Sequence, residues 1–259
     1  MDLSSIIGIV LGFASILLGF ALEGGHLTSL LAETAAIIVF GGTFGATILS
    51  FPMDDIKQVP ALLKITFTEK KFNISELIVT LTGFAEKARR EGLLCLERET
   101  ANIDDEFIRQ GIQLVVDGTD PALVRDILET QIDFTDQRHK IGADIFEAAG
   151  GYSPTLGIIG TVMGLVHVLG NLSDPESLGP SIAVAFIATL YGVCFANLVY
   201  LPIGHKLKLK SKQERFMKEI ALEGILSIQA GDNPSIVREK LRAFLSAKVR
   251  QEATQSKEA

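Results

Sequence analysis

Four long apolar runs without a charged residue constrain this chain more than any other feature of its sequence. They extend over residues 3–22, 34–53, 148–173 and 177–204. A helix needs roughly 20 predominantly apolar residues to cross about 30 Å of hydrocarbon, and each run is long enough. A soluble domain can bury one such run as a core helix but does not need four. The runs therefore predict an all-α membrane protein with four spans.

The basic residues predict which way the spans face. All 24 Lys and Arg residues lie in two stretches, Lys57 to Lys140 and Lys206 to Lys257, and neither short connection between paired spans contains one. Cytoplasmic loops are enriched in Lys and Arg close to the span ends. We therefore expect both termini and the long loop between the second and third spans to be cytoplasmic. The first run lacks the basic n-region of a secretory signal, so we expect it to be retained.

The spans divide the chain into four predicted parts. These are the first two spans (1–53), a cytoplasmic helical domain (54–147), the third and fourth spans (148–205), and cytoplasmic C-terminal helices with a tail (206–259). In the helical domain, apolar residues recur at helical spacing from Ser75 onward. A second helix is predicted over 105–116.

Two of the helices are expected to be long rods. A helix predicted from Pro121, a residue favoured at a first helical position, meets no strong breaker before the third span. The helical pattern of the fourth span likewise continues to Ile228. A turn at 231–234 precedes a further amphipathic segment, and the polar residues 251–259 are expected to be disordered.

Charge and cysteine content exclude several classes of function. The net charge of −7 gives no basis for binding nucleic acid, because a phosphate-binding surface is basic. Cys95 lies in a charged segment and Cys194 in an apolar one, so both are expected to be free thiols. Nothing resembles a nucleotide-binding loop, a metal site or an activated nucleophile. We therefore do not expect an enzyme.

Small residues form a stripe along one face of the third span and along one face of the fourth. The stripes are Pro154, Gly157, Thr161, Gly164 and Val168, and Ile182, Ala185, Thr189, Gly192 and Ala196. Such stripes let helices approach closely in lipid. Each carries a threonine near the middle of its run. Either each hydroxyl only bonds the carbonyl four residues back, or the pair lines an ion path or the seat of a buried partner helix.

The apolar runs contain no Asp, Glu, Lys or Arg. An ion path through a membrane normally needs an ionisable group at depth. His167 is the only candidate that titrates near neutral pH, and it lies nearer the outer end of its span. If this protein moves ions, the carboxylate must therefore come from another chain.

Pro154 and Pro202 each lie near the cytoplasmic end of a span. A proline inside a helix removes a hydrogen bond and clashes with the preceding turn. A static kink and a hinge both fit the sequence at these two positions.

Five motifs follow one another in the chain. They are Ala88-Arg89-Arg90-Glu91-Gly92-Leu93-Leu94-Cys95-Leu96-Glu97, Val116-Asp117-Gly118, Tyr152-Ser153-Pro154-Thr155-Leu156-Gly157-Ile158-Ile159-Gly160-Thr161, Ala188-Thr189-Leu190-Tyr191-Gly192 and Leu201-Pro202-Ile203. Together with the order of the spans, they resemble the MotA/PomA/MotP family of flagellar motor stator subunits, within the MotA/TolQ/ExbB superfamily.

The resemblance implies roles for individual residues. Pro154 and Pro202 match two prolines that couple ion passage to movement. Arg89 (or Arg90) and Glu97 match a charged pair that engages the rotor protein FliG. Stators of this family are pentamers around two copies of a single-span MotB/PomB-type partner in the bacterial inner membrane. The aspartate of that partner binds the ion, which would account for the missing carboxylate.

The resemblance favours sodium over protons as the transported ion, and no tightly bound cofactor is expected. Sodium-type members resemble this chain at Gly160-Thr161, where proton-type members tend to have alanine. Sodium-type members often carry two threonines in the fourth span, however, and here Ala188 precedes Thr189. On this interpretation Thr161 and Thr189 line the ion pathway.

Two other functions compete. An ExbB/TolQ-like energy-coupling subunit also surrounds a partner aspartate, but such subunits have three spans. A secondary ion transporter would need broken helices and a substrate site within the chain. It would not need a large lobe between the second and third spans.

Overall fold

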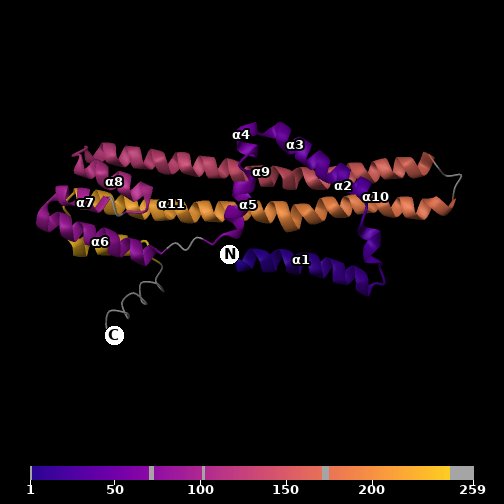
Figure 1. Cartoon of the computed structure of the whole chain (residues 1–259), viewed down its shortest axis with the longest axis horizontal. Coiled ribbons are helices and arrows are strands. Elements are labelled where there is room, and N and C mark those ends of the chain that lie inside the picture. Colours follow the sequence, from indigo (N-terminus) through magenta and orange to yellow (C-terminus); the bar gives the residue numbers. More distant parts are fainter. Residues whose placement is uncertain (1, 70–72, 101–102, 171–174, 246–259) are drawn as a thin grey trace. The chain divides into compact units, whose positions relative to one another are not determined.

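The computed structural model describes residues 2–69, 73–100, 103–170 and 175–245, and the side chains of 175–177 are not described. Every regular element in these ranges is a helix, as the all-α prediction requires (Figure 1). The chain forms two compact units. Unit 1 comprises residues 1–70 and 139–209, and unit 2 comprises residues 71–138 and 210–259. The predicted connection at Asp174 and the predicted disordered tail lie outside the described residues.

The first two spans belong to unit 1. Their elements are α1 (Leu3–Leu22), η1 (Leu27–Leu30), α2 (Glu33–Ala36), the π-helix η2 (Ile37–Gly41) and α3 (Gly42–Ser50). The first span has the predicted bounds, and the Asp2 side chain caps it by accepting from the Ser5 N–H. The second ends at Ser50, before the predicted Met53. Phe51 is extended because the residue before a proline avoids helical geometry, and Pro52 follows.

The predicted rods are present. The helix α9 (Pro121–Gly170) is continuous over 50 residues. The chain then forms α10 (Pro175–Phe195), the π-helix η4 (Ala196–Tyr200) and α11 (Leu201–Gln229) without a break (Figure 1). Unit 1 also contains α4 (Met53–Ile56) and α5 (Val59–Phe67), which periodicity did not predict.

Large apolar side chains of the spans point outward. Ile37 is 72 % exposed and Leu49 is 89 % exposed, and α1 has no buried residue. A soluble surface rarely carries so much contiguous apolar area. In the described part of the chain, four helices are long and apolar enough to cross a membrane, which confirms the four predicted spans.

Unit 2 is built from short helices around the ends of the two rods. Its own helices are α6 (Ile74–Glu91), η3 (Leu93–Leu96), α7 (Glu97–Thr100), α8 (Glu106–Val116) and α12 (Pro234–Arg242). Side chains of Asn73, Asp105 and Asn233 cap α6, α8 and α12 by accepting backbone N–H bonds. The ammonium of Lys240, in α12, lies 2.7 Å from the carboxylate of Asp232, in the turn before this helix, and lowers the pKa of Asp232.

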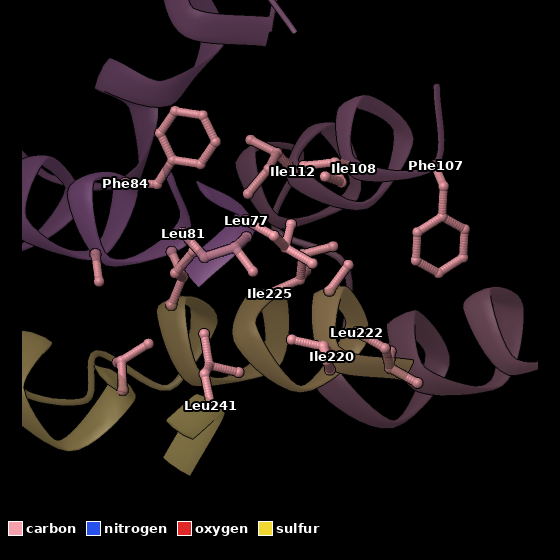
Figure 2. Close-up of a cluster of buried hydrophobic side chains, with 14 of the residues drawn as sticks. Leu77, Leu81, Phe84, Phe107, Ile108, Ile112, Ile220, Leu222, Ile225 and Leu241 are labelled. Carbon is pink, nitrogen blue, oxygen red and sulfur yellow. The ribbon is translucent and has the colours of Figure 1, made fainter. Parts of the chain in front are cut away.

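Apolar side chains of these helices meet in one core. Figure 2 shows Leu77 and Leu81 of α6, Ile112 of α8 and Ile225 of α11 directed toward one another. Helix α8 lies close to α11 at Gly111, where a Cβ would lie 2.5 Å from Ile225 Cδ1. Each such buried side chain contributes about 1.5–3 kcal/mol, so the core fixes the segments that α6 and α7 present to solvent.

Candidate functional site

Helices α9 and α10 are in backbone contact along their small-residue stripes. A Cβ at Gly192 would lie 2.5 Å from the Ser153 carbonyl oxygen, and one at Gly157 would lie 2.8 Å from the Ala188 carbonyl oxygen. Further along, a Cβ at Gly164 would lie 2.6 Å from the Ala185 Cβ. Only glycine permits this approach, and in lipid such packing holds helices together. The two predicted stripes therefore face each other.

A buried hydroxyl reinforces this contact. Ser153 is fully buried, and its Oγ donates to the Gly192 carbonyl oxygen at 3.0 Å. The bond crosses from α9 to α10 beside Pro154. Sequence reasoning assigned Ser153 no role, although the residue stands in a motif that carried the family resemblance.

Thr161 and Thr189 lie against each other at the same contact. Their Oγ1 atoms are 2.5 Å apart. The Thr161 hydroxyl is also 2.8 Å from the Ala185 carbonyl oxygen and 3.2 Å from that of Gly157, four residues back. Each hydroxyl has one hydrogen to donate, so these bonds are shared among the available acceptors. The bond to the carbonyl four residues back and the contact between the two threonines are thus both present. The hydroxyl and carbonyl oxygens form a cluster between the helices.

Tyr191 ties the fourth span to the start of the second. Its hydroxyl donates to the Leu30 carbonyl oxygen and accepts from the Ala32 N–H at 3.2 Å. The Tyr191 ring also stacks on Phe40, with ring centroids 5.9 Å apart. Sequence reasoning did not predict this role, because the partner atoms belong to a backbone more than 150 positions away.

Pro202 lies just beyond a π-helix. In a regular helix its ring would clash with the carbonyl of Leu198, four residues earlier, and its nitrogen could not donate. The π-helix η4 contains Leu198, and prolines and π-bulges are both known causes of helix kinks. Pro154, by contrast, lies inside the continuous helix α9. The two prolines are therefore embedded in different local structures.

His167 does not join the threonine pair in any described hydrogen bond. It is exposed and lines a cavity of about 450 Å³ together with Thr34 and Gly160. Among the described residues, no group of three or more His, Cys, Asp or Glu side chains could hold a metal ion.

The charged residues predicted to face a rotor are exposed on unit 2. Arg89 and Arg90 lie in the last turn of α6, and Glu97 is the first residue of α7. Between these helices, Gly92 turns the chain with a φ of 85°, a value that favours glycine. An ion pair of 2.6 Å between Lys87 and Glu99 joins α6 to α7. This pair, which the sequence analysis missed, holds the two exposed segments together.

The fold and the contact between α9 and α10 define a class of protein. It is a multi-pass helical membrane protein whose third and fourth spans pack through glycine and hydroxyl groups. Comparison with known proteins agrees. Residues 99–221 match the model of the MotA/TolQ/ExbB proton channel family, and residues 6–92 match that of the motility protein A N-terminal region. The second match favours motility proteins over the ExbB/TolQ alternative.

Individual relatives match over almost the whole chain. Motility protein A of Bacillus subtilis is 40 % identical, covering 96 % of this chain and 93 % of the relative. Chemotaxis protein PomA of Vibrio alginolyticus is 36 % identical, covering 95 % and 96 %. A solved chain of the flagellar MotAB stator complex from Bacillus subtilis is 39 % identical, covering 96 % and 98 %, with a TM-score of 0.91. The chain therefore belongs to the MotA/PomA family of flagellar motor stator subunits, a family of inner-membrane proteins that are not enzymes.

Substituting Gly192 by alanine tests the backbone contact. Because the added Cβ meets a backbone oxygen that cannot rotate away, α9 and α10 must separate, and we expect a loss of about 1–3 kcal/mol of stability. The matched control is Gly45→Ala in α3, where a Cβ meets nothing within 4 Å and helix propensity gains up to about 1 kcal/mol. The melting temperatures of both variants are measured in detergent. A melting temperature for Gly192→Ala equal to or higher than that for Gly45→Ala would contradict the backbone contact.

Proposed function

We propose that this stator subunit forms, with a MotB/PomB-type single-span partner, a channel that converts ion flow into torque on the rotor. One observation carries the proposal. The third and fourth spans meet at glycines and hydroxyls, while the four apolar runs contain no Asp, Glu, Lys or Arg. An ion at membrane depth needs a stronger partner than a hydroxyl. The aspartate of the partner subunit supplies it.

The assembly we propose is that of the family: five copies of this chain around two copies of the partner. The solved relative from Bacillus subtilis belongs to a MotAB stator complex, which supports a MotB-type partner. The unburied faces of α1 and of the other spans leave apolar surface for neighbouring copies and for lipid. The restriction of Lys and Arg to residues 57–140 and 206–257 supports cytoplasmic termini and a cytoplasmic unit 2.

We further propose that sodium is the transported ion. The Thr161 and Thr189 hydroxyl oxygens lie within hydrogen-bond distance of the carbonyl oxygens of Gly157 and Ala185. Oxygen atoms of this kind can replace water around a metal cation, whereas a proton needs no such shell. The similarity to PomA supports the same choice.

Removing sodium at a fixed proton-motive force tests which ion is transported. Cells whose motility depends on this chain should stop swimming without sodium, and Thr161→Ala should weaken their response to sodium because an oxygen is lost. The matched control is Thr155→Ala, whose hydroxyl bonds the Tyr152 carbonyl of its own helix and no other group among the described residues. Full swimming speed without sodium contradicts sodium coupling. An unchanged sodium dependence in Thr161→Ala contradicts the role of this hydroxyl.

The rotor contact is proposed at Arg89, Arg90 and Glu97. All three are exposed near the turn between α6 and α7, as a surface for a charged partner requires. The partner implied by the family is FliG. Complementary charges across such a surface steer the encounter and fix its register.

Charge reversal tests this surface. Arg89→Glu should lower swimming speed several-fold while the amount of protein in the membrane stays the same, because an exposed charge contributes little to folding. The control Thr80→Glu adds a negative charge at an exposed position of the same helix. Video tracking and quantitative blotting provide the two readouts. Equal speeds for the two variants would rule out a special role for Arg89.

Pro154 and Pro202 are proposed to couple ion passage to movement of unit 2. Both lie in helices that contribute residues to both units, and η4 ends two residues before Pro202. A π-turn beside a proline is a place where a helix can change its direction.

A further inference from the structure

The first turn of α1 is joined to α11 beyond Pro202. The Asp2 carboxylate lies 2.6 Å from the Lys206 ammonium, which also donates to the Ser4 hydroxyl at 3.0 Å. The Asp2 N–H donates to the carbonyl oxygen of Phe67, the last residue of α5, at 2.8 Å. Asp2 is only 8 % exposed. One acidic residue thus links α1, α5 and α11.

The same helix contacts the fourth span on the other side of Pro202. A Cβ at Gly12 would lie 2.9 Å from Leu198 Cδ2 in η4, and the rings of Phe13 and Phe195 lie edge to face with centroids 5.6 Å apart. Residue numbers rise along α1 as they fall along the fourth span. Helix α1 therefore runs antiparallel to the segment from Phe195 to Lys206 and contacts it on both sides of Pro202.

Between these two contacts lies a cavity of about 310 Å³. Gly8, Thr66 and Pro202 contribute to its walls, and Lys206 lies at its edge. The segment around Pro202 therefore borders this cavity together with α1, and Lys206 contributes to its wall beyond Pro202.

We propose that Asp2 and Lys206 form a latch: a pair of positioning residues that holds the segment after Pro202 against α1 and so sets the resting position of the coupling helix. The inference rests on the proposed coupling role of Pro202. When the helix changes direction at Pro202, the Lys206 ammonium leaves Asp2, and the cavity takes up the displacement. Torque then depends on a pair that touches neither the ion nor the rotor.

Two substitutions remove the charge attraction with little other change. Asp2→Asn keeps a side chain that caps helices as well as aspartate does, so α1 retains its N-cap. Lys206→Gln keeps a long polar side chain on α11. The control is Asp54→Asn, which breaks an exposed pair of 2.9 Å with Lys57 near the start of α4 and releases no second element.

Amide hydrogen exchange of this chain, in complex with its partner subunit in detergent, measures directly whether the latch holds the segment after Pro202. In Asp2→Asn and Lys206→Gln, exchange of the amides of residues 203–206 should rise by about three- to tenfold, the size expected when a partly buried ion pair is lost. The double variant should match the single variants, because all three lack the same pair. Exchange equal to that of Asp54→Asn, or effects that add in the double variant, would overturn the latch.

A torque measurement distinguishes failure of the latch from failure of the coupling role of Pro202, on which the latch rests. The torque per incorporated stator unit should fall at least twofold in both latch variants at wild-type abundance in the membrane, whereas a merely structural defect would lower abundance alone. Wild-type torque per unit in both variants would overturn the latch as a positioning device. Full torque in Pro202→Ala would instead contradict the coupling role of Pro202, and the exchange measurement would still decide the latch.

Discussion

The backbone contact between α9 and α10 determines the arrangement of unit 1. Gly157 and Gly192 let the two helices approach until a Cβ on either would collide with a carbonyl oxygen of the other. At that separation the Ser153 hydroxyl reaches the Gly192 carbonyl, and the Thr161 and Thr189 hydroxyls reach each other. The other spans attach to this pair through Tyr191, which holds the start of the second span, and through Leu198 and Lys206, which contact α1. Helices in lipid gain little from hydrophobic burial, so such packing and hydrogen bonds are what stabilise the arrangement.

Much of the fold follows from the sequence because lipid and helix geometry act locally. A run of about 20 apolar residues predicts a span whatever its neighbours are, and α1 has the predicted bounds. The long helix α9 follows from Pro121 at its start and from the lack of a strong breaker before the third span. The π-helices η2 and η4 could not be predicted, because they depend on how a helix accommodates its neighbours. Helix α5 was missed because its nine residues are too few to show a clear period.

The candidate site, like the fold, was predictable from the sequence only in part. Periodicity placed Thr161 and Thr189 on small-residue faces, but only the structure brings these faces together and gives the hydroxyls their shared partners. Asp2 gave no signal in the sequence, because an acidic residue before a helix is an ordinary N-cap. Its link to Lys206 spans almost the whole chain. The roles of Arg89 and Glu97 came from family resemblance alone, since exposed charges on a helix are common.

In the proposed function this chain forms the wall of an ion path, and the acid that binds the ion belongs to a partner. Ion flux into cells lacking their own stator tests this most directly, with the chain expressed alone, with a MotB-type partner, and with that partner carrying Asp→Asn in its span. We expect flux and torque only with the intact partner, because the apolar runs of this chain hold no carboxylate. Flux from the chain alone, or undiminished torque with the Asp→Asn partner, would contradict it.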